Sequence, residues 1–336
     1  MMAGMMHAAT NRADSGRTRA PATRERTGKT RVPPTPQPWS ALVPQLKPGT
    51  YADGMPLDEL QYLSCKLLLR PTHFVSRRSL FDFGKLLKEP SKKTGVKFSL
   101  GSFRTDPIRT REVLFVDTPD FRLYRNSFIL RRRIQYRDGF PTGEPEIVFK
   151  FRHRDLQTAA ETDVRPQIFG DHRIKFKCQA LPLKRQLGGV RVLYSHNVQF
   201  PRSNVTEVNP WSMTTMTKVF PALARIKANA HERISLVSDT IIEEVLQDVG
   251  TLDFGDKIDA PVNVALWRTR GEHRPLVGEL SFQIKFGVWK ELSLDAMKRA
   301  EAFFIALQFA ARHWIALDAT KTGMVYRLNG NAPTHE

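Results

Sequence analysis

Apolar and basic positions alternate along the chain between Val113 and Arg154, with the period of two that is typical of β-strands. A Gly- and Pro-containing loop over residues 138–145 separates two such stretches and predicts a reversal of the chain. The alternation gives each predicted strand one apolar face and one basic face. The apolar set is Phe128, Leu130, Ile134, Tyr136, Ile147, Phe149 and Phe151, with Arg132 among them, and the basic set is Arg131, Arg133, Lys150, Arg152 and Arg154.

A third stretch repeats this alternation further along the chain. Arg173, Lys175 and Lys177 share one parity, and the residues between them are apolar. Like charges gathered on one face of a sheet need either water or an anion, because burying them unpaired is costly. The pattern is therefore consistent with a solvated face or with a surface that binds a polyanion.

Other hydrophobic patterns predict elements that cover a sheet. A period near 3.6 indicates amphipathic helices, and Asn209-Pro210 is typical of a helix start. We expect helices over residues 72–87, 211–226 and 293–314, an edge strand over 56–66, paired strands over 261–268 and 276–286, and either helix or strand over 238–249.

Charge is spread over the whole chain of 336 residues, which carries a formal net charge of +18. Residues 1–45 contain seven Lys or Arg and two acids, so +13 belongs to the remainder. The Pro- and Arg-rich composition predicts a disordered tail over 1–45, a single domain over 46–330 and a disordered end over 331–336. A basic domain of this kind is suited to polyanions.

Several functional classes find no support in the sequence. No apolar run reaches the roughly 18 residues of a membrane span, and the histidines form no zinc pattern. P-loop, dinucleotide-binding and Gly-x-Ser-x-Gly motifs are absent. Cys65 and Cys178 have no metal spacing, so we expect two unpaired, buried thiols and a cytoplasmic, reducing location.

One segment resembles a known family. Phe115 to Arg133, FVDTPDFRLYRNSFILRRR, is similar to the "YFDTPDxxLxxxGxxLRxR" signature of CYTH domains, the triphosphate tunnel metalloenzyme superfamily. Residues 147–152, 278–287 and 319–328 resemble later strands and the closing stretch of that family. The resemblance implies an α+β fold in which an antiparallel sheet closes into a tunnel-like barrel, with helices packed outside.

The resemblance also implies a set of phosphate ligands. Arg131, Arg133, Lys150 and Arg152 match the family's basic strand positions. Lys66 matches the lysine that ends the opening "ExExK" strand of the family. Lys285 matches the lysine that ends the late acidic strand, and Lys321 matches the basic residue near the C-terminus.

The metal ligands of that family match less well. The opening motif here reads Tyr62-Leu-Ser-Cys-Lys66, without its two glutamates, and Glu279 alone remains of the acids on the late strand. Glu161 and Asp163 alternate as the family's "ExE" strand does and are the candidates to complete a site for Mg²⁺ or Mn²⁺. The catalytic residues are unknown.

Three functions follow as alternatives. The first is the binding of polyphosphate, a triphosphate or a nucleoside triphosphate in a basic tunnel, with weak or no catalysis. The second is a metal-dependent triphosphatase or another phosphoryl- or nucleotidyl-transfer enzyme. The third is general nucleic-acid binding by the tail and basic surface, which the lack of interleaved aromatic residues disfavours.

Overall fold

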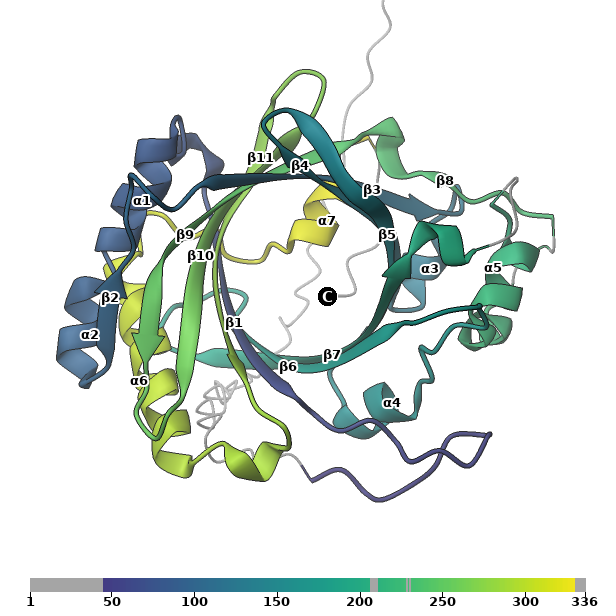
Figure 1. The fold of residues 1–336 in the computed structure, drawn as a ribbon, viewed down its shortest axis with the longest axis horizontal. Coiled ribbons are helices and arrows are strands. Elements are labelled where there is room, and N and C mark those ends of the chain that lie inside the picture. The colour runs from purple at the N-terminus through teal and green to yellow at the C-terminus, as the bar shows by residue number, and fades with distance from the viewer. Residues whose placement is uncertain (1–44, 206–210, 228, 230, 330–336) are drawn as a thin grey trace, which may run out of the picture. The chain divides into compact units, whose positions relative to one another are not determined.

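The computed structural model describes residues 45–205, 211–227, 229 and 231–329, and within them nine strands form a closed barrel (Figure 1). Each strand is hydrogen-bonded to the next, and pairing of the last with the first completes the ring. In spatial order they are β9 (Ile242–Asp253), β10 (Asp259–Thr269), β11 (Pro275–Lys285), β1 (Tyr62–Leu69), β6 (Arg173–Pro182), β7 (Val190–Pro201), β5 (Phe140–His153), β4 (Phe128–Arg137) and β3 (Ile108–Asp117).

The predicted α+β fold with a closed, tunnel-like barrel is confirmed, and its sheet is almost entirely antiparallel. The exception is the pair β1–β6, which runs parallel. Two short strands, β2 (Lys97–Leu100) and β8 (Ser235–Leu236), add to β9 and β3 beside the ring. Strand β1 therefore lies between β11 and β6, and the expectation of an edge strand over 56–66 was wrong.

Alternation along each strand separates the inside of the barrel from its cover. On β1, Ser64 and Lys66 face the cavity, whereas Leu63, Cys65 and Leu67 are buried in the outer core. The same division holds on β4, where Arg131 faces inward and Leu130 packs outside. Charged residues thus line a space enclosed by apolar layers, the reverse of an ordinary globular core.

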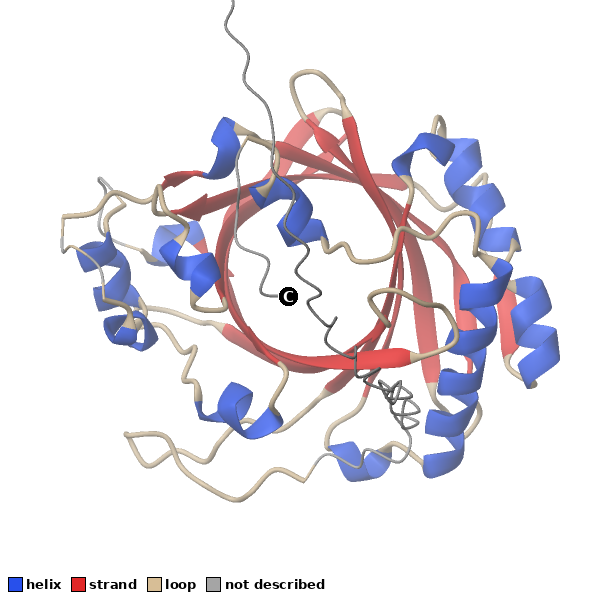
Figure 2. Cartoon of the chain, turned by 180° about the vertical axis from the view of Figure 1, so that it is seen from behind, coloured by secondary structure: helices blue, strands red, loops and turns tan. Residues whose placement is uncertain are grey.

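Helices α1 (Arg77–Lys85), α2 (Lys88–Thr94) and α6 (Leu294–Ala310) cover one side of the barrel (Figures 1 and 2). The apolar residues of α1 and α6 join those of β1, β10 and β11 in the largest core cluster. Ser293 caps α6, and Met297 and Phe304 are buried as the predicted stripe requires, although Leu294 is 48% exposed. The predicted helix over 72–87 is shorter, because Pro71–His73 forms a separate 3₁₀ turn.

A second cover consists of α5 (Met213–Val219) and a 3₁₀ turn over Pro221–Arg225, which pack on β4, β5 and β7. A single helix over 211–226 was predicted. Proline cannot donate to the preceding turn and keeps the residue before it out of the helical region, so Pro221 leaves Phe220 extended. Ser212 caps α5. The proposed start at Asn209-Pro210 lies outside the described residues.

Other elements also differ from expectation. Residues 238–249, ambiguous in sequence, contribute to strand β9. The loop predicted over 138–145 is a tight turn at Asp138-Gly139, both with positive φ, and β5 begins at Phe140. The short helix α4 (Leu156–Glu161) follows β5. Cys65 and Cys178 are buried free thiols.

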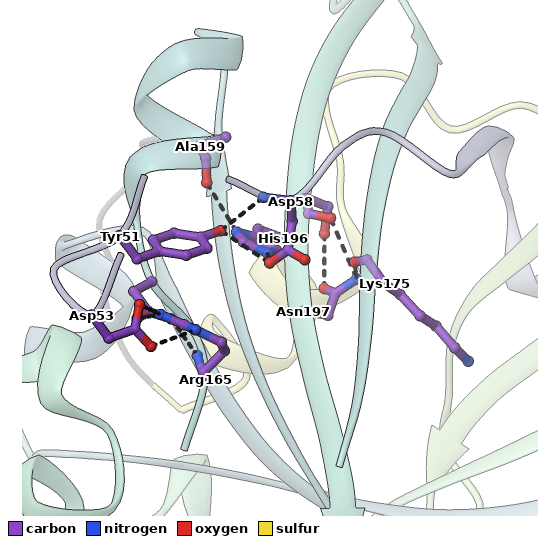
Figure 3. A network of polar contacts seen from close by, with 10 residues as sticks. Tyr51, Asp53, Asp58, Ala159, Arg165, Lys175, His196 and Asn197 are labelled. Atoms are coloured by element: carbon purple, nitrogen blue, oxygen red, sulfur yellow. Dashed lines mark hydrogen bonds and ion pairs between the residues drawn. The ribbon is translucent and has the colours of Figure 1, made fainter. Parts of the chain in front are cut away.

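An extended segment before β1 is fastened to the outside of the barrel (Figure 3). Tyr51 donates its hydroxyl to Asp58 Oδ2 at 2.9 Å, and His196 Nε2 lies 3.0 Å from the same oxygen. The other ring nitrogen of His196 lies 3.1 Å from the carbonyl of Ala159. Arg165 stacks on the Tyr51 ring at 4.3 Å. These contacts tie the segment to β7 and α4.

Helix α7 (Lys321–Tyr326) packs against inward-facing apolar residues and lies inside the ring of strands in both views (Figures 1 and 2). Its Tyr326 donates a hydroxyl to Asp117, whose carboxylate also accepts the backbone N–H groups of Thr118, Leu123 and Tyr124. Between Asp117 and the next strand lies the short helix α3 (Arg122–Arg125). Asp117 therefore joins the turn after β3 to the last helix.

No helix in the described ranges is both long and apolar enough to cross a membrane.

Replacing Asp117 with Ala is expected to lower the free energy of unfolding by roughly 3–5 kcal/mol, because three buried N–H groups and a hydroxyl lose their acceptor. Urea denaturation with an unchanged m-value measures this. The matched control is Asp120→Ala in the same turn, where the half-exposed carboxylate pairs with Arg122 and the expected loss is under about 1 kcal/mol. Equal losses for the two variants would contradict this role of Asp117.

Candidate phosphate-binding tunnel

The inside of the barrel holds a cavity of about 600 Å³ with a strongly basic lining. Eleven Lys or Arg residues and three acids line it within the part of the chain that the structure describes. The bases are Lys66, Arg109, Arg111, Arg131, Arg133, Lys150, Arg152, Lys175, Lys177, Lys285 and Lys321, and the acids are Glu244, Asp259 and Glu279.

All seven residues predicted as phosphate ligands lie together on this lining. They come from strands β1, β4, β5 and β11 and from helix α7. Strand parity brings six of them together, because side chains of equal parity on neighbouring strands share a face, whereas Lys321 is positioned by helix α7. Phosphate binding by them stays a prediction.

Two of the three predicted metal ligands are elsewhere. Glu279 lines the cavity, but Glu161 ends helix α4 and accepts a hydrogen bond from Gln157. Asp163 pairs with Arg165 at 2.6 Å, outside the barrel. Asp155 caps α4, and this helix replaces the strand on which the expectation of inward-facing acids rested.

Sequence reasoning missed four charged residues of the lining. Arg109 and Arg111 belong to β3, where they alternate with outward side chains as Arg131 and Arg133 do on β4, so the same parity rule would have found them. Parity could not place Glu244, because residues 238–249 were compatible with either a helix or a strand. Asp259 is the first residue of β10. In contrast, Arg154 and Arg173, predicted on the basic face, do not line the cavity.

The lining has two unlike walls. Nine of the eleven bases project from β1, β3, β4, β5 and β6. The facing strands β9, β10 and β11 contribute the three acids and the uncharged Asn263, Ser281 and Gln283. An anion in the cavity would therefore be drawn to one wall.

Several cations on the basic wall have no carboxylate partner. Within the described residues, no acid lies at salt-bridge distance from Lys66, Arg131, Lys150 or Lys175. Arg131 Nε is buried without a hydrogen-bond partner. Such groups are uncommon in folded proteins, because charge buried without compensation is destabilising.

Burial and repulsion between neighbouring cations lower the pKa values of the lysines on this wall. Burial, reinforced by Lys321, Arg152 and Arg131, lowers the pKa of Lys66 to about 8, although Glu279 acts in the opposite direction. Burial lowers the pKa of Lys175 to about 8 as well, with Arg173 adding to the effect. The pKa values of Lys150 and Lys177 are held well below their usual range by burial and by neighbouring cations.

Other bases are paired and thereby held in place. Arg133 donates to Glu146 at 2.6 Å and to Gln199 at 3.3 Å. Arg109 donates to Asp248 at 2.7 Å. The basic wall thus combines oriented side chains with unpaired ones.

Glu244 and Glu279 share one cation. Lys321 Nζ lies 2.8 Å from Glu279 Oε1 and 3.4 Å from Glu244 Oε1, and Arg111 lies 2.8 Å from the other oxygen of Glu244. Burial acts to raise the pKa of Glu244, but Lys321 and Arg111 outweigh it and hold that pKa well below its usual range. Both carboxylates are more than 90% buried.

A divalent cation, which the family resemblance implies, does not fit this donor set. Magnesium and manganese require several oxygen ligands, usually including carboxylates. Among the described residues, no three His, Cys, Asp or Glu side chains gather at one point. Glu244 and Glu279, which lie within reach of one common point, are already paired with the ammonium of Lys321.

Comparison with known proteins gives no family model and no curated protein that matches this sequence. Solved structures do match. A candidate adenylyl cyclase from Hippeastrum with a dominant triphosphatase activity is 13% identical over 82% of this chain and 99% of its own, at a TM-score of 0.38. A protein from Pyrococcus horikoshii is 10% identical over 78% and 97%, at 0.31, and a candidate adenylate cyclase from Bacillus halodurans is 8% identical over 78% and 95%, at 0.34.

Binding of tripolyphosphate at pH 9 is expected to take up protons, because a phosphate chain raises the depressed pKa values of Lys66 and Lys175 above about 8. Well below pH 8 both lysines are already protonated, so their contribution to the affinity should be constant there and should be lost as the pH rises above about 8. Titration calorimetry in two buffers of different ionisation enthalpy measures the uptake.

Lys66→Met should reduce this proton uptake, whereas Lys88→Met on an exposed helix position should leave it unchanged. An uptake of zero at pH 9 in the unaltered protein would show that these lysines do not meet the ligand.

Proposed function

We propose that this protein binds a linear chain of phosphates inside the barrel, as inorganic polyphosphate or as the triphosphate of a nucleotide, with little or no chemistry on it. The observation that carries the proposal is the gathering of eleven bases and only three acids around one cavity inside the barrel. Buried cations without partners, such as Arg131 and Lys150, gain most from a ligand that supplies negative charge along its length.

The geometry favours a phosphate chain over a flat or aromatic ligand. The bases project from adjacent strands around the cavity, so charge is offered along a path and not at a single point. Trp267 contributes to the lining, but Lys321 Nζ lies 4.4 Å from the centre of its ring. That face of the ring is already engaged in a cation–π contact and offers no stacking surface for a base.

Replacing both Arg131 and Arg133 with Ala is expected to weaken tripolyphosphate binding at least a hundredfold. Each lost charge-assisted hydrogen bond is worth about 1.5–3 kcal/mol. Calorimetric titration of tripolyphosphate into the full-length protein at 0.15 M salt measures the affinity.

The matched control is Arg132→Ala, which removes the residue between them on the same strand. Arg132 points outside and donates to Glu112 at 3.1 Å, so its loss should change the affinity by less than twofold. Equal weakening by both changes would place binding on the outer surface. Unchanged binding of single-stranded RNA by the double variant, without competition from tripolyphosphate, would support the nucleic-acid alternative.

Catalysis is tested in the same samples by measuring phosphate release in the presence of Mg²⁺, Mn²⁺ or a chelator. We expect no release above the rate without protein. Release that requires the metal and is lost in both the Arg131/Arg133 double variant and Glu279→Gln would instead establish a triphosphatase.

A further inference from the structure

The Lys321 ammonium stands where two buried carboxylates converge. Its Nζ lies 2.8 Å from Glu279 and 3.4 Å from Glu244, and these three side chains are 17%, 7% and 8% exposed. The ring of Trp267 closes a further side at 4.4 Å. The ammonium is therefore enclosed by two negative groups and one aromatic face, which is a complete cation site formed from the chain itself.

The backbone that carries this ammonium is fixed. Lys321 is the first residue of α7, and Thr320 caps the helix by accepting from Gly323 N at 3.0 Å. At the other end of the helix, Tyr326 is fully buried and donates to Asp117. Because both ends are anchored, the lysine is held at the carboxylate pair by the fold as well as by charge.

Other positive charges already act on these two carboxylates. Glu244 uses its other oxygen for Arg111 at 2.8 Å, and Lys66 acts electrostatically on Glu279. A divalent ion added to this cluster would be repelled by Arg111, Lys66 and Lys321, and it would have to displace Lys321 to reach both glutamates.

From this arrangement, and resting on the proposed function, we propose that Lys321 is a built-in replacement for a divalent metal ion, so that phosphate chains bind in this barrel without metal. The ammonium, together with Arg111, balances the charge of the two carboxylates, and of its three N–H donors one can be accepted by a phosphate oxygen. It has no exchangeable coordination position, so it cannot bind and activate a water molecule as a metal ion does. The same substitution therefore accounts for binding without cleavage.

The test removes the ammonium while keeping the length of the side chain. Lys321→Met should expose Glu244 and Glu279 to solvent cations and create a Mn²⁺ site. Titration of Mn²⁺ followed by electron paramagnetic resonance, without any phosphate present, should show binding at least tenfold tighter than in the unaltered protein. Adding Glu279→Gln to the variant should remove the gain.

The control separates a specific site from a general loss of positive charge. Lys177→Met also removes one buried tunnel lysine, but Lys177 donates to Gln283 at 2.7 Å and not to an acid. It should gain no Mn²⁺ affinity. An equal gain in both variants, or equally tight Mn²⁺ binding by the unaltered protein, would overturn the proposal.

A second measurement needs no variant and decides the matter if Lys321→Met does not fold. The affinity of the unaltered protein for tripolyphosphate should not increase when Mg²⁺ or Mn²⁺ replaces a chelator, whereas a tenfold or greater increase would overturn the role of Lys321. A barrel that binds no tripolyphosphate under either condition would refute the proposed function and the metal-free binding that depends on it.

Discussion

Closure of the sheet is the constraint on which the other properties depend. The pairing of β3 with β9 turns the inward face of nine strands into the wall of an enclosed space. On an open sheet the same lysines and arginines would face water and be well solvated. Inside the ring they face one another at low dielectric, which depresses the pKa of Lys66 and leaves Arg131 without a partner. The affinity of the cavity for anions is therefore a property of the closed barrel and not of any single residue.

The acids of the lining reduce the positive electrostatic potential in their own part of the cavity. Glu244 and Glu279 lie close to Lys321 and Arg111, so their part of the wall is already nearly neutral. The excess of positive charge remains on the opposite wall, where β4, β5 and β6 contribute six bases. Helix α7 packs among the inward apolar residues and also supplies the lysine that pairs with Glu244 and Glu279.

Sequence patterns predicted the parts of this site that depend on local alternation. Arg131, Arg133, Lys150 and Arg152 were placed correctly because parity along a strand fixes the face of each side chain. The failures concern positions where local pattern is insufficient. Glu161 and Asp163 alternate like strand residues, but Asp155 caps a helix there and turns them outside. Glu244 lies in a segment with two apolar periods, and only its pairing with β3 and β10 selects the strand. No local signal shows that Lys321 meets Glu244 and Glu279, since that contact joins residues 77 and 42 positions apart.

The pairing pattern also determines the order in which the protein can be assembled during synthesis. Strand β1 emerges from the ribosome long before its partner β11, and β3 long before β9. Tyr326, which donates a hydrogen bond to Asp117, is synthesised 209 residues later. Contacts at such separations are slow to form, and the early strands keep unpaired edges until the C-terminal part of the chain is available. A chain that stops before β9 would lack the strand that pairs with β3 and closes the ring around the basic side chains. Premature termination is thus expected to give an open, aggregation-prone sheet and not a smaller version of the barrel.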